Sequence, residues 1–326
     1  MENQVDLSVL QPGVLLLLAA VGVDAILGDP TYRWHPIRLL GASLGWLERL
    51  LRAGGLDGRF GGVLLFLFLS LIWVGGTSLL ALLLANVSRA AAFGFHLFVL
   101  FHMIALRDLL KHGMAINRAA QSGDLTAARE AAANLVARDT GSMDAAACRR
   151  AAIESMSESL VDGFISPIFW YALLGLPGVV LLKLVSTMDS MVGFKTPRYL
   201  LFGWCGARAD DLLHFVPARV TWALMGIAAA VIPGCSGRKA WRIGWQQHAV
   251  VPGPNSGWSE AAAAGALERR LAGPIWLRGR LVTEVWLGEE SDTEGGSHQD
   301  FIRAGKLIVA TAAVFVVGVV CALVFV

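Results

Sequence analysis

A stripe of charged residues in the centre of the chain has the spacing of one helix face. Arg150, Glu154, Glu158 and Asp162 follow one another at intervals of four, and residues four apart are neighbours on a helix. Three carboxylates on one face repel one another, which a bound Mg²⁺ would relieve through carboxylate oxygens. We therefore expect Glu154, Glu158 and Asp162 to form a catalytic metal site. A solvated face with ordinary Arg–Glu pairs is the alternative.

The stripe runs directly into an apolar segment beginning near residue 160. Ionisable residues at membrane depth are candidates for function, because burying them in lipid is costly. Just before the stripe, Asp139 and the following Thr, Gly and Ser predict a turn, and Ser142 or Asp144 is expected to cap the next helix.

A second charged group lies between residues 183 and 219. It contains Lys183, Lys195, Arg198, Arg208, Arg219, Asp189, Asp210 and Asp211. Arginine suits bidentate capture of phosphate and lysine acts as a point charge, so this mixture suits a phosphate with its metal. Juxtamembrane charge that only fixes topology is the alternative, although it does not explain the paired aspartates.

Two shorter stretches carry further candidates. Residues 24–41, DAILGDPTYRWHPIRLLG, leave an apolar run and concentrate charge around Pro and Gly. We expect Asp29, His35 and Arg38 to form a wall of the site that faces the acid stripe. Around Asn255 and Ser256, a Gly- and Pro-rich turn precedes an Ala-rich helix; such an N-terminus can hold an anion, but a simple cap by Asn255 or Ser259 is the better interpretation.

The composition indicates that these residues are positioned by membrane helices. Of the 326 residues, 56% are hydrophobic and only 16% are charged, whereas a soluble domain carries about 25% charged residues. Mean hydropathy is +0.60. The fold class predicted is therefore mostly α, a polytopic membrane protein with polar helical loops that carry the site.

The apolar runs predict the spans. Residues 61–86 and 305–326 are long enough to cross a bilayer, 12–27 is slightly short, and 91–106 is weaker. Residues 160–182 and 217–234 either cross or dip into the membrane, and we favour dipping because of Asp162. One domain is expected over 1–326, with 289–304 as a mobile loop and 305–326 as the C-terminal transmembrane helix.

Charge and motifs exclude several classes of function. The net charge of +2 and the lack of a basic stripe exclude a nucleic-acid partner. The four cysteines are scattered, without the spacing of a metal site. His96, His102 and His112 are interpreted as packing or interfacial residues. We expect a multi-pass protein of the inner (plasma) membrane, and the Arg-rich regions next to the spans predict an active site on the cytoplasmic side.

Taken together, several long motifs resemble those of the CobD/CbiB family, the adenosylcobinamide-phosphate synthases of cobalamin biosynthesis. The motifs are DAILGDPTYRWHPIRLLG, NLVARDT, AAIESMSESLVDGFISPIFW, STMDSMVGFKTPRYLLFGWCGARADDLLHFVPARV and PNSGWSEAAAAGAL. Their order and spacing match from about residue 14 to residue 288.

The resemblance implies an ATP- and Mg²⁺-dependent ligase. It would join a carboxyl of adenosylcobyric acid, a corrinoid, to aminopropanol or its O-phosphate, with other late enzymes of the pathway as partners in the bilayer. The implied catalytic residues are Glu154, Glu158, Asp162 and Lys183. The implied substrate- and phosphate-binding residues are Asp29, His35, Arg38, Arg138, Asp139, Asp189, Ser190, Arg208, Asp210, Asp211, Arg219, Asn255 and Ser256.

The sequence also departs from the family pattern. Ser159, Ser186 and His214 stand where the pattern has Asn, and VVPGPNSGWSE replaces a stretch resembling HPSPNAGWPE. Each of the three positions thus lacks the carboxamide of the pattern. Two functions other than a ligase stay open. One is a non-enzymatic membrane sensor resembling the AmpE proteins, which would not need the complete acid set. The other is a transporter, which would show two related halves with broken helices.

Overall fold

The computed structural model describes residues 7–325, and helices account for 72% of the chain. The mostly-α prediction is therefore confirmed. The chain divides into two compact units that are interleaved in sequence. The first comprises Met1–Ala105, Ser166–Leu213 and Val319–Val326, as far as these are described, and the second comprises Leu106–Ile165 and His214–Gly318.

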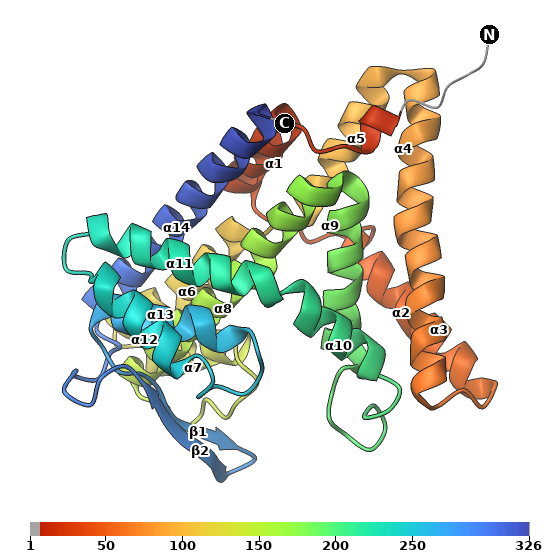
Figure 1. Cartoon of the computed structure of the whole chain (residues 1–326). Coiled ribbons are helices and arrows are strands. Elements are labelled where there is room, and N and C mark those ends of the chain that lie inside the picture. The colour runs from red at the N-terminus through yellow and green to blue at the C-terminus, as the bar shows by residue number, and fades with distance from the viewer. Residues whose placement is uncertain (1–6, 326) are drawn as a thin grey trace. The chain divides into compact units, whose positions relative to one another are not determined.

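The first unit is built from apolar helices. Its elements are η1 (Leu7–Leu10), α1 (Val14–Leu27), α2 (Pro36–Ala53), α3 (Arg59–Ser70), η2 (Leu71–Gly75), α4 (Gly76–Val87), α5 (Arg89–His102), α9 (Ser166–Val192) and α10 (Trp204–Leu213). A π-helical turn, η2, joins α3 and α4 into one continuous rod (Figure 1). Leucines of α2 and α3 pack with Val185 and Met188 of α9 and with Phe202 to form the core.

The segment α9 is bent rather than straight. Gly175 has φ +65 and ψ −146, a conformation that is not helical, and Pro177 follows it. A Cβ on Gly175 would lie 1.9 Å from the carbonyl oxygen of Leu10, so the bend also requires a residue without a side chain. The two arms of α9 are visible in Figure 1.

The second unit combines helices with one hairpin. Its helices are α6 (Leu106–Gln121), α7 (Leu125–Ala133), α8 (Ala145–Leu160), η3 (Val161–Ile165), α11 (Phe215–Val231), α12 (Gly237–Gln247), α13 (Ser256–Leu267) and most of α14 (His298–Val324). Strands β1 (Leu271–Leu277) and β2 (Arg280–Leu287) pair antiparallel, with Leu271 opposite Leu287. Helix α13 packs against α8, α11 and α12.

The hairpin was not predicted from the sequence. Its two-residue turn, Arg278-Gly279, has positive φ at both positions, as a type I′ turn requires. The usual sequence signal for this turn is Asn-Gly or Asp-Gly. An Arg at the first position carries no such signal.

Six helical segments within residues 7–325 are long and apolar enough to cross a membrane. They are Leu7–Leu27, Arg59–Val87, Arg89–Gln121, Ala145–Val192, Trp204–Val231 and His298–Val324. Both segments that the sequence left open, 160–182 and 217–234, fall largely within these helices. Whether they cross or dip stays a prediction, as does the side of the membrane for each polar region.

The acidic segment before the last helix differs from the expected loop over 289–304. Helix α14 already begins at His298, so residues 298–304 are helical and the helix starts seven residues earlier than predicted. The last residue of the predicted helix, Val326, lies outside the described residues.

The acidic segment also contacts α12. Lys239 Nζ lies 3.1 Å from Glu289 Oε2 and 3.3 Å from Asp292 Oδ1. These carboxylates, with Glu268, raise the pKa of Lys239.

Candidate functional site

The acid stripe lies on α8 and its π-helical continuation η3. Asp144 caps α8 as expected, since its Oδ1 accepts the backbone N–H of Ala147 at 2.7 Å. Glu154 is buried, and its carboxylate accepts a hydrogen bond from the Arg138 guanidinium. Glu158 and Asp162 are exposed. The single row predicted from spacing thus becomes one paired, buried acid followed by two accessible acids.

A fourth acid joins this cluster from another element. Glu260, on α13, is only 6% exposed. Burial and the nearby carboxylates of Glu154 and Glu158 raise the pKa of Glu260 well above its ordinary value. Sequence reasoning did not assign Glu260 to the site. The available signal was the run of Ala and Gly after it, because a helix that is apolar on every side is buried.

The acids do not form a preassembled metal centre. Among the side chains of residues 7–325, no group of three or more His, Cys, Asp or Glu residues is arranged to hold a metal ion. Mg²⁺ bound with a nucleotide commonly uses one or two carboxylates and completes its shell with phosphates and water. The exposed Glu158 and Asp162 fit that mode, whereas Glu154 is engaged by Arg138. The Mg²⁺ site stays a prediction.

Two departures from the family pattern lie beside acids. His214 Nε2 is 3.4 Å from Asp162 Oδ1 in the second unit. In the first unit, Ser186 Oγ donates to Asp210 Oδ1 at 2.9 Å. Both substituted residues therefore contact an acid of the predicted site.

Arg219 connects α11 to the turn before α13. Its Nη1 donates to the Phe215 carbonyl at 2.6 Å and to Asn255 Oδ1 at 3.2 Å. Its guanidinium also lies 4.8 Å from the ring centroid of Trp258. Asn255 occupies the N-cap position, but its side chain accepts from Arg219 rather than capping α13, and Ser256 is the first residue of that helix. Trp258 packs against Val161, next to Asp162.

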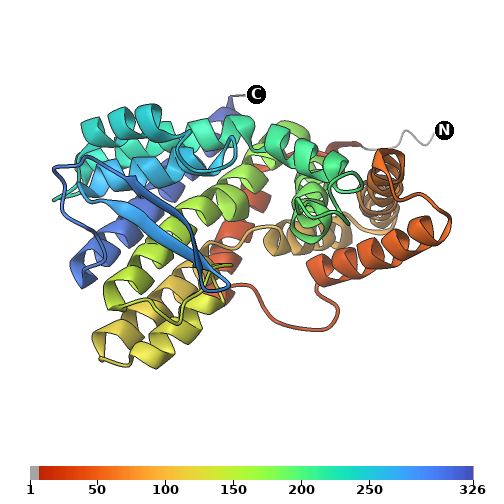
Figure 2. The ribbon, with the colours of Figure 1, turned by 90° about the horizontal axis from the view of Figure 1, so that it is seen from below.

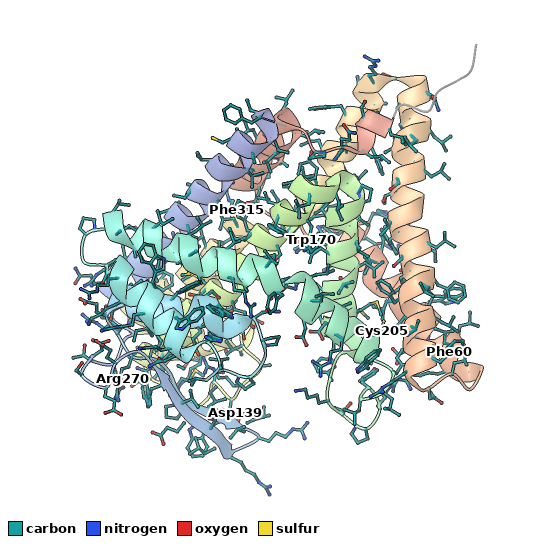
Figure 3. The ribbon with its side chains drawn as sticks, viewed as in Figure 1. Phe60, Asp139, Trp170, Cys205, Arg270 and Phe315 are labelled. Carbon is teal, nitrogen blue, oxygen red and sulfur yellow. The ribbon has the colours of Figure 1, made fainter. Side chains whose placement is uncertain are left out.

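Asp139 fastens its loop to the hairpin. Its backbone N–H donates to the Trp276 carbonyl at 2.8 Å, and its Oδ2 accepts the N–H of Gly279 at 2.7 Å. Figure 3 labels Asp139 next to the strands. One carboxylate oxygen is thus committed to the hairpin turn, while the neighbouring Arg138 reaches the acid stripe.

In the first unit, Asp29 and His35 form a pair at the start of α2. His35 Nδ1 accepts the N–H of Ile37, so Nε2 carries the proton and donates to Asp29 Oδ1 at 2.7 Å. Alongside, His102 Nδ1 donates to the Phe98 carbonyl, and the Tyr32 hydroxyl donates to His102 Nε2 at 2.7 Å. The ring centroids of His35 and His102 are 4.8 Å apart.

The remaining predicted residues of the first unit lie on α2, α9 and α10. Arg38 is exposed on α2, and Ser190 is exposed on α9. Lys183 lies one turn before Ser186 on α9, with Asp189 further along, and Arg208 Nη1 donates to Asp211 Oδ2 at 3.0 Å on α10. Lys183 and Ser186 share a helix face. The Ser186 hydroxyl on that face donates to Asp210.

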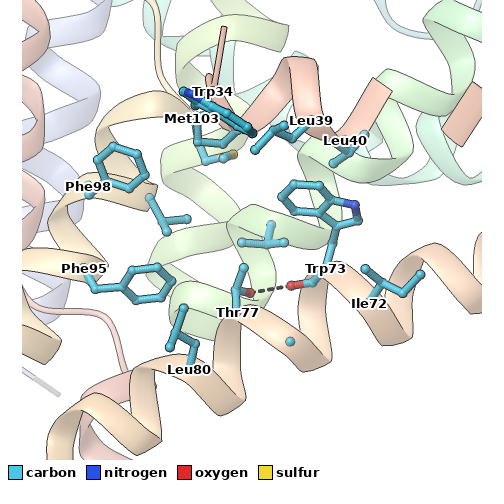
Figure 4. Close-up of a pocket in the computed structure, with 14 residues that line it drawn as sticks. Trp34, Leu39, Leu40, Ile72, Trp73, Thr77, Leu80, Phe95, Phe98 and Met103 are labelled. Atoms are coloured by element: carbon cyan, nitrogen blue, oxygen red, sulfur yellow. Dashed lines mark hydrogen bonds between the residues drawn. The ribbon is translucent and has the colours of Figure 1, made fainter. Parts of the chain in front are cut away.

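An apolar pocket of about 330 Å³ lies in the first unit and is lined by residues of α2, η2, α4, α5 and α9. Figure 4 shows Trp34 and Met103 at one end and Thr77 and Leu80 at the other, with Phe95 and Phe98 along the side. Its wall carries few polar groups, so it offers apolar contact rather than acid–base chemistry.

The structure therefore brings the predicted residues together in two sets. The second unit unites Glu154, Glu158, Asp162 and Arg138, with Arg219, Asn255 and Ser256 close by through Trp258. The first unit contains Asp29 with His35, and Lys183 with the Ser186–Asp210 contact. The prediction that Asp29, His35 and Arg38 face the acid stripe stays a prediction, because these residues belong to different units.

Comparison with known proteins identifies the family. The family model described as "CobD/Cbib protein" matches residues 17–308. A Sinorhizobium protein named cobalamin biosynthesis protein CobD is 38% identical over 282 residues, which cover 83% of this chain and 86% of the relative. A Pelobacter propionicus CobD is 37% identical, covering 90% and 91%. A Salmonella typhi protein named cobalamin biosynthesis protein CbiB is 34% identical, covering 88% and 90%. No solved structure matches. The chain belongs to the CobD/CbiB family.

Proposed function

We propose that this protein acts in cobalamin biosynthesis as a membrane-bound, ATP-dependent ligase. It joins a carboxyl of adenosylcobyric acid to aminopropanol or aminopropanol O-phosphate through an amide bond. The relatives, which are named for cobalamin biosynthesis and match over most of their length, support the pathway. The observation that carries the chemistry is the convergence of Glu154, Glu158, Asp162 and Glu260 beside Arg138 in one unit.

The proposed reaction has two steps. The terminal phosphoryl group of ATP passes to a carboxylate oxygen of the corrinoid, which gives ADP and an acyl phosphate. The amine nitrogen then attacks the acyl carbon, the bond from that carbon to the phosphate oxygen breaks, and inorganic phosphate leaves. Charge neutralisation and positioning contribute most to such transfers.

Residues of the second unit have distinct roles in this proposal. Glu158, which is exposed beside the buried pair, accepts the proton that the attacking amine loses. Arg138 holds the Glu154 carboxyl group in place through its hydrogen bond. Asp162, or Glu158 before it takes up the proton, would hold Mg²⁺ together with substrate phosphates, and the ion would supply positive charge near the phosphoryl group.

Residues of the first unit complete the proposal. Lys183 is assigned to the transferring phosphate, Arg208 to a phosphate of ATP, and Asp189, Ser190, Asp210 and Asp211 to the remaining substrate contacts. Asp29, His35 and Arg38 are assigned to the corrinoid and its side chains. The Arg-rich regions next to the spans favour the inner (plasma) membrane, with the site on the cytoplasmic side.

The test is direct assay of the purified protein in detergent. Adenosylcobyric acid, ATP, Mg²⁺ and aminopropanol phosphate are incubated with it, and mass spectrometry measures the amide product while a coupled assay measures ADP. Formation of the amide with stoichiometric ADP is expected. Lack of both would contradict the ligase proposal and favour a sensor or a transporter.

A further inference from the structure

A second, polar cavity lies in the second unit, away from the accessible acids. It has a volume of about 190 Å³ and is lined by Arg138, Ser142, Asp144, Arg150, Pro274 and Trp276, among others. Strand β1 packs against α8 here (Figure 2). The cavity therefore lies between the first turns of α8, the loop that precedes it and the hairpin.

Two arginines in its wall each retain a buried donor. Arg150 is 8% exposed, and its Nε–H has no hydrogen-bond acceptor among the described residues; the same holds for the buried Nε–H of Arg138. One terminal nitrogen of each arginine is engaged elsewhere: Arg138 Nη2 donates to Glu154, and Arg150 Nη1 donates to the Gly295 carbonyl at 3.0 Å. A buried donor of a charged group that lacks an acceptor is costly. A ligand oxygen that reaches these nitrogens as the two guanidinium groups turn toward the cavity would remove that cost.

The surroundings favour an anion. The cavity adjoins the N-terminal turn of α8, whose helix dipole attracts negative charge. Asp144 also lines it and carries a negative charge, but this carboxylate caps the helix, with its Oδ1 accepting the N–H of Ala147. Glu294 lies 3.7 Å from Arg150 and also pairs with Arg270, so it only partly neutralises Arg150. The Ser142 hydroxyl adds a neutral donor to the wall.

The size of the cavity restricts the ligand. Pockets for drug-sized molecules measure about 300–1,000 Å³, so a cavity of about 190 Å³ suits a phosphate group with a few carbon atoms. A whole nucleotide or a corrinoid would not fit within it. Trp276 and Pro274 provide an apolar wall for the short carbon chain.

We propose that this cavity binds a small phosphate ester, with the guanidinium groups of Arg150 and Arg138 holding its phosphate. The assignment of aminopropanol O-phosphate as that ester rests on the proposed function. Arg150 was interpreted from the sequence only as the basic end of the acid stripe, and the cavity gives it a binding role.

Isothermal titration calorimetry on the purified, detergent-solubilised protein tests this site. The probes are aminopropanol phosphate, inorganic phosphate, unphosphorylated aminopropanol and ADP. Aminopropanol phosphate is expected to bind, inorganic phosphate to bind more weakly, and aminopropanol not to bind. Arg150→Gln should weaken binding of the ester by about tenfold or more, since it removes a charge-assisted contact.

Two further variants distinguish loss of the binding site from a general loss of folding. Ala147→Leu fills the cavity while keeping both arginines, and it should also abolish binding of the ester. Arg280→Gln, at an exposed position of β2 that does not line the cavity, removes the same charge and should bind like the unaltered protein.

The outcomes separate this proposal from the ligase proposal. Binding that is lost in Arg150→Gln and Ala147→Leu supports the cavity site, even if the protein forms no amide. Binding of the ester that is unchanged in both variants overturns it, whether or not the ligase is active. Loss of ADP binding alone in these variants also overturns it, because the cavity would then serve a nucleotide phosphate.

Discussion

The two units differ in how much charge their interiors hold. In the first unit, leucines of α2 and α3 pack with Met188 and Phe202, and its described pocket is apolar. In the second, Arg149, Arg150, Glu154 and Glu260 are all buried. Burying charge is costly unless it is paired and hydrogen-bonded. The second unit thus concentrates buried arginines and acids, whereas the buried acids among the described residues of the first unit are Asp24 and Glu48.

If this contrast is correct, the largest effect comes from breaking the buried pair of the second unit. Arg138→Ala leaves Glu154 buried without its cation, which should destabilise the protein by about 3–5 kcal/mol. Chemical denaturation in mild detergent measures the loss. The double variant Arg138→Met with Glu154→Met should recover most of the stability; failure to recover would mean that Arg138 acts through other contacts.

The next largest effect concerns activity rather than stability. Glu158→Gln keeps the shape of an exposed side chain but removes its charge, and turnover should fall by about 100- to 1,000-fold, as for loss of one transition-state group. The circular dichroism spectrum should stay unchanged, and the unfolding midpoint should not fall, because the substitution also removes a carboxylate that repels Glu260. Glu130→Gln, on α7, is the matched control. Near-normal turnover by Glu158→Gln would make the stripe a solvated helix face.

In the first unit, close packing rather than charge should be the sensitive feature. A Cβ on Gly62 would lie 2.0 Å from the carbonyl oxygen of Phe202. Gly62→Ala should therefore cost about 1–3 kcal/mol through overpacking, measured as a lower unfolding midpoint. Gly76→Ala, with no atom within 4 Å of the added Cβ, is the control. Equal midpoints for both variants would contradict the packing of Phe202 against α3.

A smaller effect concerns the pH dependence of folding stability, to which Glu260 of the second unit contributes. The pKa of Glu260 is raised in the folded protein, so the folded state holds this proton more tightly than the unfolded state. Its contribution to stability is present at low pH and is lost as the pH rises from about 4.5 through the raised pKa. One such group changes the slope by at most about 1.4 kcal/mol per pH unit.

Glu260→Gln should remove that decline and stabilise the protein at neutral and alkaline pH. Unfolding midpoints from pH 5 to pH 9 measure it, and Glu130→Gln again serves as the exposed control. A variant that loses stability equally at every pH would show that Glu260 is a hydrogen-bonded structural residue rather than a repelled acid.

Particular residues show how far sequence reasoning reached. The four-residue spacing of Glu154, Glu158 and Asp162 placed them on one helix, and Asp144 was predicted as a cap, because both depend on local periodicity and on one hydrogen bond within a turn. The hairpin, with its Arg278-Gly279 turn, was missed. The start of the last helix was placed seven residues late, because a polar first turn resembles a loop.

The sequence by itself determined the apolar helices, the membrane class, the family motifs and the acid stripe. These follow from composition and from repeats a few residues long. Only the tertiary structure decided that Glu260 joins the stripe, that Arg138 neutralises Glu154, and that Arg150 and Arg138 share a cavity with Trp276. Such contacts join segments far apart in the chain. The energetic cost of each charge depends on its burial, and a side chain is buried only after those segments have packed.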